Sequence, residues 1–141
     1  MERDMALVRL WKSLIDVEDY FQIGIKAELD EPHLFGGKIA APIANAYLCF
    51  HAAKPFLTRE ISAIAESAIS TAGKEFNDVL HLSRRTMVVT GRDEAKRIVN
   101  NKLGSSLELF RSSTFLLKQL IPDLIKDKTK RDITNSAGVY R

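Results

Sequence analysis

Hydrophobic residues recur every three or four positions in four stretches of the chain, which is the spacing of amphipathic helices. The first stretch covers residues 4–29 and places Leu7, Leu14 and Phe21 on one side, with charged residues mostly on the other. Pro32 disfavours a helical residue before it, and a pair of glycines follows. We therefore expect the first helix to end before Pro32.

The second and third stretches have clear boundaries. Residues 42–54 begin at Pro42, which suits the first turn of a helix, and Pro55 ends the segment. This segment is apolar almost all round, as is typical of a helix that packs between others or meets a partner subunit. The third helix is predicted over 58–82, with the Thr58 hydroxyl as its N-terminal cap.

The fourth helix is predicted over 91–121, because Thr90 is followed three residues later by an acid in the manner of a capping box. The connection before it, residues 83–89, is rich in β-branched residues and is compatible with an extended segment, although a single short strand has no mate. Pro122 is expected to kink or end the fourth helix, and residues 122–130 to add one or two further turns.

These four segments predict an all-α fold: an antiparallel bundle of four main helices with a short C-terminal helical extension. The chain has 141 residues, of which 45% are hydrophobic, so it is expected to form a single domain over 1–141 with 132–141 as a flexible tail. The single cysteine, Cys49, excludes an intramolecular disulfide. Without a signal-peptide pattern or an apolar run of about 20 residues, a cytoplasmic protein with no membrane partner is expected.

The sequence carries little that resembles catalytic chemistry. It has no phosphate-binding glycine loop and no serine in nucleophile-elbow spacing, so no enzyme and no cofactor are predicted. Asp78 and His81 lie three residues apart on one helix face, but they supply only half of a helical metal site. His33 and His51 stand alone. No metal is predicted, and a carboxylate-histidine metal enzyme is the weakest of three hypotheses.

Charge is distributed unevenly along the chain. Residues 1–80 hold eight Lys and Arg against twelve Asp and Glu, whereas residues 81–141 hold thirteen against six. Such asymmetry favours either the binding of a polyanion by the second half or the packing of one half against the other, within or between subunits.

The positive charge is densest around the start of the fourth helix. Five cationic residues fall within fourteen positions there, and two more follow at a spacing that places them near one helix face, with small polar residues between. The cations lie beside the free amides of a helix start, which favour anions. The resulting prediction is a nucleic-acid-binding surface made of Arg84, Arg85, Arg92, Lys96, Arg97, Arg111 and Lys118. A solvated helix face is the competing interpretation.

No aromatic residue interleaves with these cations, so backbone contact with a duplex is expected and base stacking is not. The preferred hypothesis is a non-enzymatic nucleic-acid-binding protein, with RNA or DNA undetermined, that works as a homo-oligomer. The alternative is an adaptor or assembly module without a nucleic-acid role. In that case the apolar second helix and the acidic first helix would form the interface.

Overall fold

The computed structural model describes residues 2–30 and 40–136, with side chains as far as Lys126 apart from Met87. Helices and short turns account for these residues, and no strand occurs among them. The elements are α1 (Glu2–Asp19), the π-helix η1 (Tyr20–Gly24), α2 (Ile25–Asp30), α3 (Ala41–Ala53), the 3-10 turn η3 (Lys54–Phe56), α4 (Arg59–Val89) and α5 (Arg92–Ser136). The all-α prediction is confirmed.

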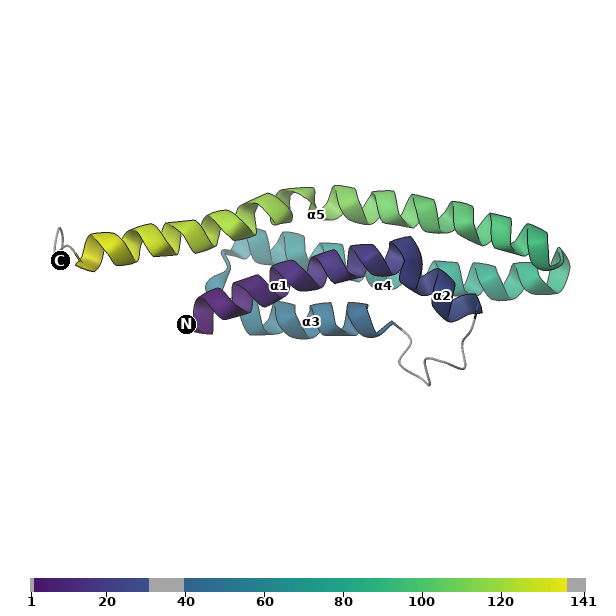
Figure 1. The fold of residues 1–141 in the computed structure, drawn as a ribbon, viewed down its shortest axis with the longest axis horizontal. Helices are drawn as coiled ribbons and strands as arrows, with labels where there is room; N and C mark the ends of the chain where they lie inside the picture. Colours follow the sequence, from purple (N-terminus) through teal and green to yellow (C-terminus); the bar gives the residue numbers. More distant parts are fainter. Residues whose placement is uncertain (1, 31–39, 137–141) are drawn as a thin grey trace.

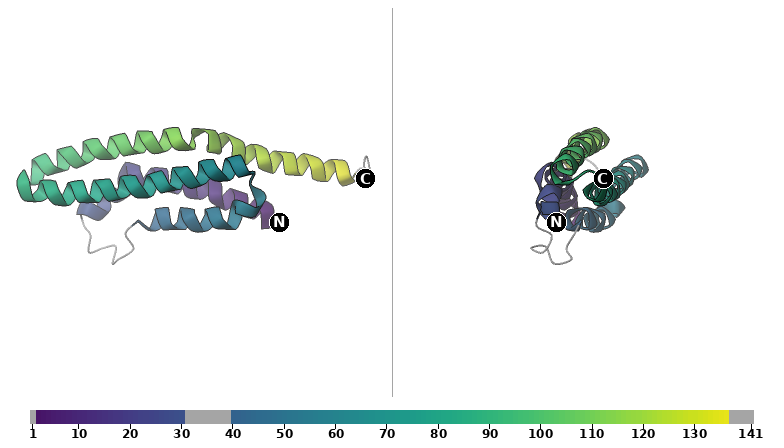
Figure 2. Two further views of the ribbon diagram at one scale, coloured as in Figure 1. Left: turned by 180° about the vertical axis from the view of Figure 1, so that it is seen from behind. Right: turned by 90° about the vertical axis from the view of Figure 1, so that its right-hand side faces the viewer.

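The helices form an antiparallel bundle in which α1 packs on α3 and α5, and α4 packs on the same two helices (Figure 1). The end view in Figure 2 shows these four arranged around a common centre. At one end the α4–α5 hairpin runs past the end of α2, and at the other α5 continues beyond the rest of the bundle (Figure 1). The predicted bundle and its C-terminal extension are therefore both present.

The core is formed by the hydrophobic stripes that the sequence predicts. Leu10 and Leu14 of α1, Phe50 of α3 and Phe110 of α5 are fully buried. The ring of Phe21 stacks on Phe110 at a centroid distance of 6.2 Å. Burial of a side chain of this size contributes roughly 1.5–3 kcal/mol, so these contacts dominate the stability of the bundle.

Two helix boundaries follow from the predicted capping residues. The Thr58 hydroxyl accepts a hydrogen bond from the Ile61 amide at 3.2 Å, which confirms it as the cap of α4. Pro42 lies in the first turn of α3, as expected. That helix ends at Ala53 and passes into η3, which contains Pro55.

The expectation that residues 83–89 are extended is wrong, because α4 continues as a helix to Val89. The Thr86 hydroxyl donates to the carbonyl of Leu82 at 2.8 Å, an i to i−4 bond that lets a β-branched residue sit in a helix. Thr90 does not start the next helix either. Its hydroxyl donates to the Thr86 carbonyl at 2.9 Å and so completes the end of α4.

Pro122 does not end α5, which runs through it to Ser136. A proline has no N–H, so it leaves the carbonyl four residues earlier, that of Lys118, without its helical partner. The indole Nε1 of Trp11 donates to this carbonyl at 3.2 Å. Residues 132–136 of the predicted tail are therefore helical, and residues 137–141 lie outside the described part of the chain.

The predicted first helix contains a π-helix that its hydrophobic spacing does not reveal. At Gly24 a Cβ atom would lie 2.6 Å from the Tyr20 ring, so glycine permits the close approach of that ring. The Tyr20 hydroxyl donates to the buried carboxylate of Glu28 and accepts from the Ala40 amide at 2.9 Å. Tyr20 thus fixes Ala40, which has a left-handed backbone with φ of 63°, at the start of α3.

A second buried carboxylate joins α4 to α5. Glu75 accepts hydrogen bonds from Lys102 at 2.9 Å and from Ser106 at 2.8 Å. Burial on its own would raise the pKa of Glu75, but these two hydrogen bonds and the Lys102 charge together lower it. Glu75 is therefore held in its ionised form.

We expect Trp11→Phe to lower the free energy of unfolding by about 1–3 kcal/mol, because the Lys118 carbonyl loses its donor. In a Pro122→Ala background the restored amide supplies that donor, so the same substitution is expected to cost less. Chemical denaturation of the four proteins of this double-mutant cycle measures the difference. An equal cost in both backgrounds would show that the indole does not replace the amide donor that Pro122 lacks.

The two buried carboxylates predict opposite responses to pH. Burial raises the pKa of Glu28, and the hydrogen bond from Tyr20 offsets this only in part. Its ionised form therefore costs stability above the folded-state pKa, and the cost is absent below the unfolded value of about 4.3. Glu28→Gln keeps the acceptor without the charge, so it is expected to stabilise the protein at neutral pH and to have no such effect below pH ~4 in denaturation experiments.

The same substitution at Glu75 is the matched control. Because the pKa of Glu75 is lowered in the folded protein, its ionised form stabilises the fold at pH values above the unfolded-state pKa. This stability is lost as the pH falls through the folded-state pKa. Glu75→Gln is therefore expected to cost about 1–3 kcal/mol at neutral pH, and less in acid. Effects of the same sign for the two variants would contradict this assignment.

Candidate nucleic-acid interface

The end of the α4–α5 hairpin, residues 84–97, gathers most of the predicted cationic site; we call it the hairpin tip. Arg84 and Arg85 come from the end of α4, and Arg92 is the first residue of α5. All three are exposed, and among the described residues no carboxylate forms an ion pair with any of them. The tip as a whole carries five cationic and two acidic residues.

A two-residue turn brings these arginines together. Gly91 has a φ of +84°, a left-handed conformation that glycine adopts without the penalty of a Cβ atom. Because only Thr90 and Gly91 separate the two helices, the last turn of α4 and the first turn of α5 lie side by side (Figure 1). Cations that are seven or eight positions apart in sequence thus share one end of the bundle.

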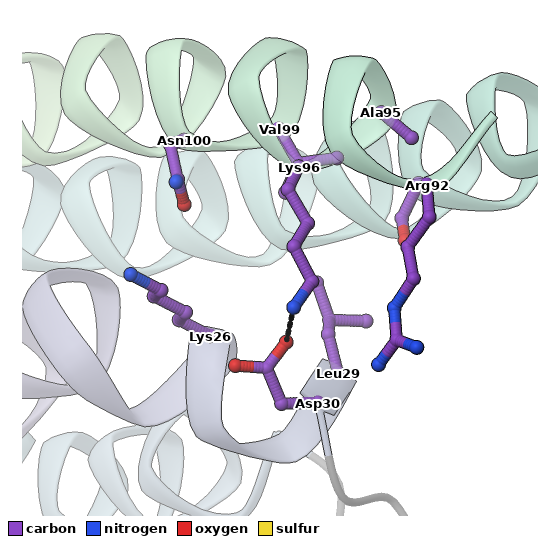
Figure 3. Close-up of a pocket in the computed structure, with 9 residues that line it drawn as sticks. Lys26, Leu29, Asp30, Arg92, Ala95, Lys96, Val99 and Asn100 are labelled. Carbon is purple, nitrogen blue, oxygen red and sulfur yellow. Dashed lines mark ion pairs between the residues drawn. The ribbon is translucent and has the colours of Figure 1, made fainter. Parts of the chain in front are cut away.

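A pocket of about 290 Å³ adjoins the tip, between α2 and the start of α5. Three cationic side chains line it, Lys26, Arg92 and Lys96, together with Asp30 and Asn100. Figure 3 shows Arg92 and Lys96 reaching from α5 toward α2, and Lys26 lying on the opposite wall. Three cations against one carboxylate make this tip pocket an attractive position for an anion.

Two cations of the tip form exposed ion pairs. Lys96 Nζ lies 3.7 Å from Asp30 Oδ1, with both side chains more than 40% exposed. Arg97 pairs with Glu94 of the same helix, and their hydrogen bond lowers the pKa of Glu94 and raises that of Arg97. Exposed pairs of this kind contribute little to stability, so either cation can exchange its partner for a phosphate.

Arg111 and Lys118 are not part of the tip. Both lie on the side of α5 that faces α1, where Arg111 is 3.5 Å from the Glu18 carboxylate and Lys118 also binds it. Arg111 lies nineteen positions after Arg92, which is about 28 Å along α5. The structure thus divides the seven predicted residues into five at the tip and two that join α1 to α5.

The structure adds Lys26 and Asn100 to the candidate site. Neither belongs to the basic cluster of the sequence, and Lys26 lies more than fifty positions from it. The signal that could have found Lys26 is the expected antiparallel packing of the first and last helices, which brings it beside the start of α5. A second hollow, of about 260 Å³, continues from these two residues along η1 and α5 past Gly104 to Leu107.

The small polar residues between the predicted cations form a separate surface. They are all exposed and follow the outer face of α5. This set comprises Asn101, Gly104, Ser105, Glu108 and Ser112. At the border of this face Gly104 also lines the hollow beside η1.

The metal hypothesis gains no further ligands. Asp78 lies 3.8 Å from Lys74, and His81 is exposed. In the described part of the chain no three His, Cys, Asp or Glu side chains come together as a metal site would require. His51 is exposed on α3 beside the Phe50 ring, and His33 lies outside the described residues.

None of the described helices is long and apolar enough to cross a membrane.

Comparisons with protein families, with curated proteins and with solved structures give no match for this chain. The class of protein is therefore defined by its fold and surface, as an antiparallel helical bundle with a cationic hairpin tip.

We expect Gly91→Ala to cost about 1–2 kcal/mol of stability, because alanine is strained at the left-handed φ of the turn. Gly73 is the matched control: it lies within α4, and a Cβ there meets nothing within 4 Å. Gly73→Ala is expected to stabilise the helix by up to about 1 kcal/mol. Thermal denaturation compares the two, and a neutral Gly91→Ala would show that the turn does not require glycine.

Proposed function

We propose that this protein is a non-enzymatic nucleic-acid-binding protein that contacts the phosphate backbone through its hairpin tip and works as a homo-oligomer. One observation carries the proposal: Arg84, Arg85 and Arg92 are exposed at one end of the bundle with no ion pair to a described carboxylate. Unpaired guanidinium groups at neighbouring helix ends suit phosphates that repeat along a strand.

The tip pocket supports the same function. Lys26 and Lys96 extend the arginine cluster onto α2 and the first turns of α5, and Asn100 adds a neutral donor. Phosphate oxygens accept from such a mixture of charged and amide groups. The proposed contact set is therefore the five cations of the tip together with Lys26, while Arg111 and Lys118 serve the α1–α5 contact.

The chemistry of the tip favours backbone contact over base recognition. Residues 83–100 contain no Phe, Tyr or Trp, so no ring is present on which a base can stack. Binding is accordingly expected to depend on salt and on duplex shape, with little dependence on base sequence.

A protein-interaction function is the second candidate, because the tip also carries apolar residues. Val88 is 86% exposed and Val89 is 74% exposed at the end of α4. Exposed apolar groups at one position favour a protein partner. Contact made mainly by these valines would depend weakly on salt, which separates it from phosphate binding.

The central experiment measures binding of duplex DNA and duplex RNA over a range of salt concentrations. Replacing Arg84, Arg85 and Arg92 together with Gln is expected to weaken binding of DNA and to reduce the slope of log K against log salt by about 0.9 for each phosphate that the variant no longer neutralises. The three residues are exposed, so the free energy of unfolding is expected to change little.

The matched control removes the same charge elsewhere. Arg9, Lys12 and Arg59 are exposed on α1 and at the opposite end of α4, and their replacement with Gln is expected to leave the slope unchanged. Equal losses in the two triple variants would show that binding reflects net charge and not the tip. Absence of binding by the wild-type protein at low salt would reject the function.

A further inference from the structure

The outer face of α5 exposes three large apolar side chains. Leu109 is 46% exposed, Phe115 is 64% exposed and Leu116 is 47% exposed. The end view shows α5 at an edge of the bundle, where another helix can reach it (Figure 2). We propose that this face binds the α5 helix of a second copy of the chain, antiparallel and related by a two-fold axis at the level of Phe110. This interface specifies the homo-oligomer of the proposed function, on which it rests, and it involves neither the tip nor nucleic-acid binding.

The distribution of side-chain size along this face sets the register. The small residues Gly104 and Ser105 occupy its N-terminal half, whereas Phe115 and Leu116 occupy its C-terminal half. The position that a Cβ of Gly104 would occupy has no atom within 4 Å. An antiparallel copy centred on Phe110 places Phe115 level with Ser105 and one position, about 1.5 Å, from the level of Gly104. Leu116 is level with Gly104 and one position from Ser105.

The two-fold relation repeats each of these contacts. In an isologous interface residue i meets residue j, and j meets i, so both halves of the face are filled at once. Leu109 then lies within one position of the level of Ser112. A parallel copy would instead set Phe115 against Phe115 and Gly104 against Gly104, which leaves a clash at one end and a gap at the other.

Charge favours the same orientation. Glu108 is exposed on this face, and its carboxylate lies 3.3 Å from Arg111. Arg111 also binds Glu18 of α1, so it lies at the border of the outer face, where its side chain is 41% exposed. Centring the antiparallel pair on Phe110 brings Glu108 within one helical position, about 1.5 Å, of the level of Arg111 of the second copy, in both directions. Opposite charges thus meet twice across the interface, while a parallel pair would align Glu108 with Glu108.

The helix α3 is less suited to this role, although its apolar sequence pointed to it. Its buried residues Ile43, Ala46, Phe50 and Ala53 pack within the bundle. Among its residues only Leu48 is a large exposed hydrophobic side chain. Apart from Leu48, the large apolar side chains of α3 are thus at least partly covered by its own chain.

Cysteine cross-linking tests the register. In a Cys49→Ser background, Ser105→Cys combined with Leu116→Cys is expected to give a covalent dimer on mild oxidation, because the levels of the two positions differ by only about 1.5 Å. Either cysteine alone is expected to remain uncross-linked, since Ser105 of the two copies lies about 15 Å apart along the axis. Cross-linking by each single variant would indicate a parallel pair and overturn the proposal.

Light scattering tests the interface without cross-links. The wild-type protein is expected to have the mass of a dimer, and Phe115→Ser with Leu116→Ser that of a monomer. Both side chains are exposed, so far-ultraviolet circular dichroism of the variant is expected to match the wild type. Leu48→Ser is the matched control and is expected to stay dimeric. A monomeric wild type, a dimeric Phe115/Leu116 variant or a monomeric Leu48→Ser would each refute the α5 interface.

The two proposals fail separately. The Arg84, Arg85 and Arg92 variant is expected to keep the dimer mass while losing affinity for duplex DNA. Loss of the dimer in that variant would place the interface at the tip and contradict its assignment to the outer face of α5.

Discussion

The hydrogen bond from the Trp11 indole to the Lys118 carbonyl is the constraint on which the arrangement of α1 and α5 depends. Pro122 leaves that carbonyl unpaired inside a helix, where an unsatisfied acceptor costs roughly 1–3 kcal/mol once water is excluded. A donor from α1 removes the cost and fixes one helix against the other. The continuity of α5 through Pro122 is therefore a property of the packed bundle and not of α5 itself.

Polar contacts on either side of this bond maintain the same register. Arg3 donates to the Leu124 carbonyl at 3.0 Å, and Glu18 binds Arg111 and Lys118. Moving forward along α1 thus means moving backward along α5, as an antiparallel pair requires. The same relation extends to the Asp30–Lys96 pair, so the position of the tip pocket follows from contacts made far from it.

The sequence predicted what depends on local pattern. The hydrophobic stripes and the Thr58 cap are readable from spacing alone, and the structure confirms both. The rules for proline and for β-branched residues are also local, and they failed at Pro122 and at 83–89 because partners from other turns or helices satisfy the backbone there. The π-helix, and with it the contact from Tyr20 of η1 to Glu28 of α2, was missed for a related reason, since the hydrophobic period hardly changes across one inserted residue.

The candidate site shows the same limit for charge. Spacing on one helix placed Arg111 and Lys118 with the tip cations, but a periodic pattern does not show whether a cation faces solvent or a carboxylate on the neighbouring helix. The register between α5 and the first helices decides which cations face carboxylates. It also places Lys26 of α2 beside Arg92 and Lys96, although Lys26 is not part of the basic cluster in the sequence. The uneven charge of the two halves of the chain is thus partly internal, because Glu18, Asp30 and Glu75 neutralise cations of α5.

The cations of the tip are the ones left to contact nucleic acid in the proposed function. The proposed dimer would determine how the tips of two subunits are placed on a duplex. In an antiparallel pair centred on Phe110 the two Arg92 residues lie about 54 Å apart along α5, at opposite ends of the assembly. Two such ends cannot merge into one continuous basic surface. The dimer would instead hold two separate segments of duplex, or two well-separated points on a bent one, so that association of the subunits would add a second contact without enlarging the first.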